Sequence, residues 1–125
     1  MYYTYMLRCT DNSIYTGITT DLERRMNEHF SQDIKAAKYT KRHKPKKLET
    51  AWYSENKVSA SKLEYHIKKR LSKKQKEALI ENYKLLKKYE FDKINATEYK
   101  KVRKNSIEKL NTNLNLLHIY SDSNN

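Results

Sequence analysis

The chain has 125 residues, which is the length of one domain of ordinary size. It carries 27 lysine and arginine residues against 15 aspartate and glutamate residues, a formal net charge of +12, and a strongly basic domain attracts polyanions such as nucleic acids. The single cysteine excludes an intrachain disulfide and a zinc site built from several thiolates.

The positive charge belongs to the first part of the chain. Residues 1–88 hold 21 basic against 10 acidic residues, whereas residues 89–125 hold 6 against 5. The start of the chain lacks the pattern of a secretory signal peptide, and no apolar run approaches the roughly 20 residues that cross a bilayer. With a lone cysteine, these features predict a soluble cytoplasmic protein without membrane contact.

Two runs of β-forming residues, near 2–8 and 13–18, open the chain and flank a Thr-Asp-Asn turn, so they predict an antiparallel hairpin. A turn centred near Thr10 would place Tyr5 opposite Tyr15, with both phenols on one face of the sheet. Gly17 is the only glycine and ends the second run. It indicates unusual backbone angles or the close approach of another group.

A helix is predicted near 21–31, because Thr20 and Glu23 fit a capping box that starts a helix at Asp21. Arg25 and His29 are four residues apart and therefore share a face of this helix. Each of these side chains alone could belong to the core or to a solvated surface. Together, a cation, an imidazole and two phenols are expected to converge beside the hairpin.

This combination resembles the GIY-YIG nuclease domain family, in particular its small single-domain bacterial members, and is similar to the catalytic domain of the excision-repair nuclease subunit. Residues 4–6 (Thr-Tyr-Met) stand at the first motif of the family, with Tyr3-Thr4 in place of Gly-Ile, and residues 15–17 (Tyr-Thr-Gly) stand at the second. The helix near 21–31 resembles the arginine helix of the family. The resemblance implies that the catalytic groups include Tyr5, Tyr15, Arg25 and His29.

Residues 31–49 are polar and basic and are expected to form a surface loop with a cationic patch around Tyr39. The alternative is a solvated lysine-rich loop without a ligand. Thr40 matches a hydroxyl residue of the family in the loop before the third strand. The residues predicted to bind nucleic acid are Arg24, Lys38, Tyr39, Thr40, Lys41, Arg42, Lys44, Lys46 and Lys47.

A third strand is predicted over 47–53, because Leu48, Thr50 and Trp52 alternate with the residues of the other face. Trp52 is expected in the core, since large aromatic side chains dominate small cores.

A second helix is predicted over 59–71, where Ala60, Leu63, Ile67 and Leu71 recur at helical spacing and form a buried stripe. By default Glu64 pairs with Lys68 one turn later, whereas the resemblance places Glu64 at the glutamate that binds a single divalent metal. Ser72 and Gln75 fit a second capping box and predict a third helix over 73–89.

These elements predict an α/β fold of the α+β type, with a small three-stranded, mostly antiparallel sheet flanked by helices. Residues 1–88 would form the GIY-YIG-like nuclease domain. Residues 89–125 would form a C-terminal extension, partly helical with a frayed Asn-rich end, that either covers the sheet or mediates dimer contacts. The chain is expected to be a monomer or a weak dimer.

The resemblance implies an endonuclease that hydrolyses phosphodiester bonds in DNA, in repair or recombination, with one Mg²⁺ or Mn²⁺ ion held by Glu64. One carboxylate suffices for an ion that keeps most of its waters. The alternative is a catalytically idle module that binds nucleic acid with the same basic face. Whether the DNA is single-stranded, duplex or branched stays open.

Overall fold

The computed structural model describes residues 1–88 and 94–123, and its centre is an antiparallel sheet of four strands. The strands lie in the order β2-β1-β3-β4. Their bounds are Tyr2–Cys9 for β1, Ile14–Thr19 for β2, Pro45–Ser54 for β3 and Lys100–Lys101 for β4. The predicted fold class is confirmed, but the sheet has four strands rather than three, because a short strand from the C-terminal part pairs with β3.

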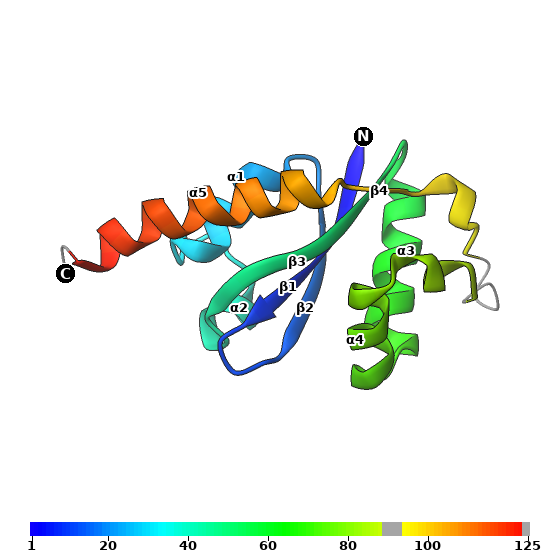
Figure 1. Ribbon diagram of the computed structural model, residues 1–125, viewed down its shortest axis with the longest axis horizontal. Helices are drawn as coiled ribbons and strands as arrows, with labels where there is room; N and C mark the ends of the chain where they lie inside the picture. The colour runs from blue at the N-terminus through cyan, green and yellow to red at the C-terminus, as the bar shows by residue number, and fades with distance from the viewer. Residues whose placement is uncertain (89–93, 124–125) are drawn as a thin grey trace.

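Helices cover both faces of the sheet. As Figure 1 shows, α1 (Leu22–Phe30) and α5 (Lys104–Ser123) lie on one side of the sheet, and α3 (Lys57–Arg70) and α4 (Lys73–Glu81) lie on the other. The short elements are α2 (Lys38–Arg42) and the 3-10 helices η1 (Tyr83–Lys88) and η3 (Ala96–Glu98). None of the helices in the described residues is long and apolar enough to cross a membrane.

The central strand β1 divides two hydrophobic cores. Met6 points into the core under α3 and α4, where Trp52 is only 2% exposed, as the sequence predicts. Tyr5 and Leu7 point into the other core, under α1 and α5, together with Met26. This alternation is the two-residue period of a strand buried on both faces.

The predicted register of the hairpin is wrong by two residues. Tyr5 lies opposite Gly17, and Leu7 lies opposite Tyr15. The turn is centred on Asp11 rather than Thr10, because the Asp11 carboxylate accepts hydrogen bonds from Ser13 and the next residue, Asn12, adopts a φ of 70°. A shift of two residues leaves every side chain on its face, so the two phenols still share one side of the sheet.

The strict alternation predicted for β3 is also wrong at its start. Met6 pairs with Thr50 but Leu7 pairs with Leu48, so the register skips Glu49. This bulge turns Leu48 into the α1–α5 core, opposite to Trp52. Glu49 then faces Arg8 and accepts a hydrogen bond of 2.9 Å from its Nη2.

All three predicted helices differ from their predicted bounds, and α3 begins at Lys57, two residues earlier than expected, after the cap residue Asn56. The cap of α1 is Asp21 rather than Thr20, because the Asp21 carboxylate accepts from the backbone N–H of Arg24. The stretch predicted as a loop contains α2, and β3 already begins at Pro45. The Ser72 capping box is confirmed, but α4 ends at Glu81, since Asn82 is extended and η1 follows. Residue 89 lies outside the described residues.

The C-terminal part covers the sheet, which is one of the two alternatives left open by its sequence. Ile107 and Leu114 of α5 enter the α1–α5 core. The Asn111 side chain accepts from the Leu48 backbone N–H and donates to its carbonyl, both at 2.8 Å. The Asn-rich segment is helical as far as Ser123, and the last two residues lie outside the described part of the chain.

Two leucines of α5 provide a test of this packing. Leu114 is 1% exposed and Leu116 is 58% exposed. We expect Leu114→Ala to lower the free energy of unfolding by about 2–5 kcal/mol, since it leaves a cavity in the core. Leu116→Ala should change it by less than about 0.5 kcal/mol. Urea denaturation measures both, and equal effects of the two variants would contradict the docking of α5.

Candidate active site

Three elements bring two phenol rings and an imidazole together at the β2 edge of the sheet. Tyr5 comes from β1, Tyr15 from β2 and His29 from α1. The ring centroids are 6.2 Å apart for the two tyrosines, 5.7 Å for Tyr5 and His29, and 5.6 Å for Tyr15 and His29. The predicted convergence of the two phenols with the imidazole is therefore present in the structure.

Gly17 makes this cluster possible. A Cβ atom built at Gly17 would lie 2.5 Å from the hydroxyl oxygen of Tyr5 and 3.0 Å from the Tyr15 ring. Real Cβ atoms do not approach other atoms this closely, so any larger residue would displace the Tyr5 hydroxyl. The close approach predicted from the single glycine is confirmed, and it does not involve a left-handed backbone.

A chain of hydrogen bonds fixes the proton positions inside the site. The Thr40 hydroxyl donates to the Ala37 carbonyl at 3.1 Å, so it accepts the bond of 2.8 Å from Nδ1–H of His29. Nε2 of His29 then carries no proton and accepts from the Tyr5 hydroxyl at 2.7 Å. His29 is therefore the tautomer protonated at Nδ1, and its Nε2 atom accepts the hydrogen bond of the Tyr5 hydroxyl.

Burial sets the protonation states of these groups. It lowers the pKa of His29 from 6.5 to about 4, with a smaller contribution from the nearby Arg25 guanidinium. Burial also raises the pKa of Tyr5 well above its usual range, and it raises that of Tyr15, which Arg25 partly opposes. At neutral pH the imidazole is therefore uncharged and both phenols keep their protons.

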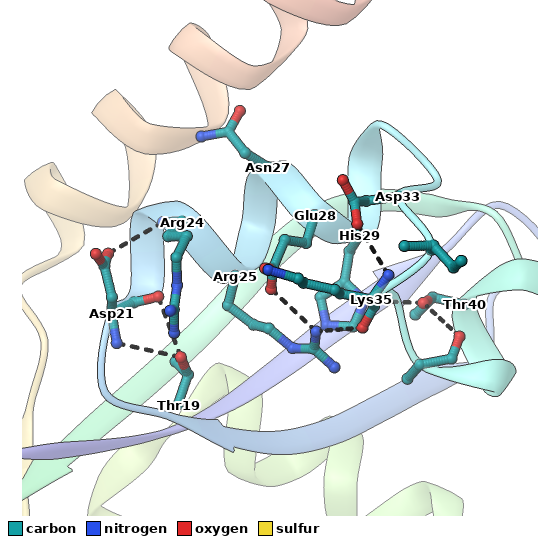
Figure 2. A network of polar contacts seen from close by, with 12 residues as sticks. Thr19, Asp21, Arg24, Arg25, Asn27, Glu28, His29, Asp33, Lys35 and Thr40 are labelled. Carbon is teal, nitrogen blue, oxygen red and sulfur yellow. Dashed lines mark hydrogen bonds and ion pairs between the residues drawn. The ribbon is translucent and has the colours of Figure 1, made fainter.

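Arg25 is held by its own helix and by the loop that follows. Its Nη1 donates to the Glu28 carboxylate at 3.0 Å and to the Lys35 carbonyl at 2.7 Å (Figure 2). These two bonds orient the planar guanidinium, and its charge acts on both tyrosines. A guanidinium held in this way can bind two oxygens of a phosphate.

Glu64 faces the same cluster from α3. Its carboxylate lies 3.6 Å from the Lys68 ammonium, which confirms the ion pair expected by default. The charge of Glu64 also acts on both phenols, where it raises the pKa. Lys68 Nζ lies 5.0 Å from the centroid of the Tyr15 ring.

The donor set around Glu64 fits only one type of metal ion. Among the described residues no group of three or more His, Cys, Asp or Glu side chains is placed to hold a metal. One carboxylate beside two phenols excludes a site in which the protein supplies every ligand. It suits an ion such as Mg²⁺, which prefers oxygen and keeps several waters.

The predicted nucleic-acid-binding residues divide into two groups. The cations are exposed, as their role requires, and comprise Arg24, Lys38, Lys41, Arg42, Lys44, Lys46 and Lys47. Thr40 is instead fully buried against His29, so it positions the imidazole and does not face a nucleic acid. The Tyr39 ring stacks on His43 at 4.2 Å and lies 5.4 Å from Tyr15, so it packs within the site.

His29, predicted as a catalytic group, is fully buried, and its Nε2 atom accepts a hydrogen bond from the Tyr5 hydroxyl. The bond between His29 and Thr40 carried no sequence signal, because it depends on how α2 packs against α1. The position of Lys68 over Tyr15 was missed for the same reason, since it depends on the packing of α3 beside β2.

The pKa of His29 generates a prediction about stability. In the unfolded chain the His29 imidazole takes up a proton near pH 6.5, whereas in the folded protein it does so only near pH 4. The unfolded state therefore binds more protons between these values, and the free energy of unfolding should fall as the pH drops through this range. Between pH 7 and pH 5 the contribution of His29 should lower the free energy of unfolding by about 2 kcal/mol. Urea denaturation of wild type and His29→Gln measures it, and an equal loss in both would refute it.

The sequence profile of the GIY-YIG catalytic domain matches residues 1–78. A UPF0213 protein of Fusobacterium nucleatum is 49% identical over 73 residues, which cover 58% of this chain and 71% of that protein. A UPF0213 protein of Cupriavidus necator is 49% identical over 77 residues, covering 62% and 80%. The solution NMR structure of the UPF0213 protein BH0048 from Bacillus halodurans is 43% identical, covers 65% of this chain and 84% of that one, and superposes with a TM-score of 0.42. The profile match spans more than half of the chain, which therefore belongs to the GIY-YIG catalytic domain family.

Proposed function

We propose that this protein is a metal-dependent endonuclease that hydrolyses phosphodiester bonds in DNA. Membership of the GIY-YIG family implies a nuclease fold and a nucleic-acid substrate. The observation that carries the proposal is the meeting of Tyr5, Tyr15, Arg25 and Glu64 at one edge of the sheet. This set offers a phosphate-binding cation, hydroxyl groups for water and a carboxylate for a metal ion.

The two tyrosines have different roles in this proposal. The Tyr5 ring is fully buried and its hydroxyl is bonded to His29, so Tyr5 forms the fixed inner wall of the site. Tyr15 is only partly buried and lies on the edge strand, so its hydroxyl orients the attacking water. Arg25 binds the phosphate and stabilises the negative charge that develops there.

Glu64 would hold the metal ion, Mg²⁺ or Mn²⁺, with waters and phosphate oxygens as the remaining ligands. When bound, such an ion supplies Lewis-acid stabilisation of the phosphate and lowers the pKa of bound water. Glu64 would have to leave Lys68 to do so, and the Lys68 side chain is exposed to solvent.

A second candidate function rests on the same ion pair. Lys68 already neutralises Glu64, and both phenols keep their protons at neutral pH. A site arranged in this way could bind nucleic acid without cutting it. The cleavage of single-stranded, duplex and branched DNA with Mg²⁺ or Mn²⁺, compared with EDTA, separates the two functions.

Replacing the carboxylate tests the metal site. Glu64→Gln keeps the shape of the side chain but removes the anion, so cleavage should fall at least ~100-fold while DNA binding persists or tightens. Glu81→Gln, at an exposed position on α4, is the matched control and should cleave like wild type. Full activity of Glu64→Gln would rule out Glu64 as the metal ligand.

Replacing the guanidinium tests the phosphate contact. Arg25→Lys keeps the charge but not the planar fork, so turnover should fall about 100-fold, and Arg25→Ala should lower both turnover and affinity. Arg103→Lys, at an exposed site before α5, is the control. Single-turnover cleavage and binding in EDTA give the two quantities. If Arg25→Lys retained wild-type turnover, charge alone would suffice and the fork would have no role.

A further inference from the structure

The active site lies at the middle of an open edge of the sheet. In the strand order of the sheet, β2 pairs only with β1, so its other side faces away from the sheet. Tyr15 and Gly17 are central in β2, whereas Asn12 precedes it and Thr19 ends it. The six residues of β2, Ile14–Thr19, span roughly 17 Å between the hairpin turn and the Thr19 end.

A basic groove lies at the Thr19 end of this edge. It is a cavity of about 390 Å³ whose walls come from the end of β2, from α1 and from the start of α3. Its charged lining is Arg24, Arg25, Lys35, Lys57 and one acid, Glu28. Glu28 is paired with Arg25, and the Lys35 side chain extends beside this pair in Figure 2. With Glu28 neutralised by Arg25, the three cations Arg24, Lys35 and Lys57 remain in the groove.

A cluster of lysines lies at the opposite end. Lys73 Nζ donates to the Asn12 carbonyl at the hairpin turn, and Lys68 lies over the Tyr15 ring. Lys76 belongs to the same cluster, since burial and the charges of Lys73 and Lys68 lower its pKa. Of the neighbouring acids, Glu77 pairs with Arg8, whereas Glu64 pairs with Lys68 and so offsets part of the charge of this cluster.

The two basic regions and the site between them lie along one line, the β2 strand. We propose that this edge is a track that holds the phosphates of one nucleic-acid strand on both sides of the bond at Arg25. The track consists of Arg24, Lys35 and Lys57 on one side and Lys68, Lys73 and Lys76 on the other. It extends the proposed function, because it names residues on α3 and α4 that hold the same substrate.

The spacing of the charges selects this partner. A small anion would occupy one end of the track and leave the other unsatisfied. A nucleic-acid strand carries one phosphate per nucleotide and can therefore reach both ends at once. Phosphates at the Lys68–Lys73–Lys76 end would also relieve the mutual repulsion of three ammonium groups. Arg24 and Lys35 come from α1 and the loop after it, Lys57 and Lys68 from the two ends of α3, and Lys73 and Lys76 from α4, so the two clusters border opposite ends of β2.

Two double variants test the track. Lys73→Gln with Lys76→Gln removes two charges from one end, and Lys35→Gln with Lys57→Gln removes two from the other. The matched control is Lys104→Gln with Lys109→Gln, which makes the same charge change on exposed residues of α5. Lys73 and Lys57 are the first residues of their helices, where losing a cation does not weaken the helix. Thermal unfolding verifies that each variant folds.

Binding is measured in EDTA, by fluorescence anisotropy of a labelled single-stranded oligonucleotide over a range of salt. Each track variant should bind at least ~5-fold more weakly, and its salt slope should shrink by about 0.7 for each lost phosphate contact. The affinity of the control variant for the oligonucleotide should fall by less than ~2-fold. In cleavage assays with Mg²⁺ the track variants should raise KM and leave kcat within about twofold, because they do not touch the reacting phosphate.

The two proposals fail in different ways. If the wild type cleaves no DNA but both track variants weaken binding, the nuclease function is refuted and the track stands. If the wild type cleaves and the track variants bind like the control, the track is refuted and the function stands. If only one of the two double variants binds the oligonucleotide more weakly, the nucleic-acid strand contacts one side of Arg25 only. That result would refute a track that spans the site.

Discussion

The close approach of the Tyr5 hydroxyl to Gly17 is the constraint on which the site depends. Tyr5 reaches across β2 only because no Cβ stands in its way. From there its hydroxyl meets His29 of α1, and His29 meets Thr40 of α2. One missing side chain therefore fixes how two helices dock against the hairpin, and the inner half of the site follows from it.

The site has a buried half without charges and a rim that carries paired charges. Tyr5, His29 and Thr40 are buried and uncharged, and each hydrogen bond of their chain has one possible direction. Arg25 and Glu64 lie at the rim, where each is paired with a neighbour of opposite charge. The site therefore has uncharged, hydrogen-bonded groups inside and paired charges at its rim.

The C-terminal part explains why the site lies at one edge of the sheet. The short strand β4 pairs with β3, and α5 covers the same side through Asn111 and Leu114. That edge is thereby closed, and β2 remains as the open one. Exposed edge strands attract unwanted pairing partners, and charged side chains around them oppose it. The lysines and arginines beside β2 are charged side chains of this kind.

By itself the sequence determined the hairpin, the strand β3 and the helices α1, α3 and α4, and it singled out Tyr5, Tyr15, Arg25 and His29. The spacing of Tyr5, Tyr15, Arg25 and His29, and the buried stripe of α3, are local periodicities that a chain expresses before it folds. The tertiary structure alone decided how these elements meet. The turn at Asn12 set the hairpin register, the bulge at Glu49 turned Leu48 over, and α2 brought Thr40 under His29. Lys68, Lys73 and Lys76 joined β2 in the same way, because contacts between distant segments depend on packing and leave no periodic trace in the sequence.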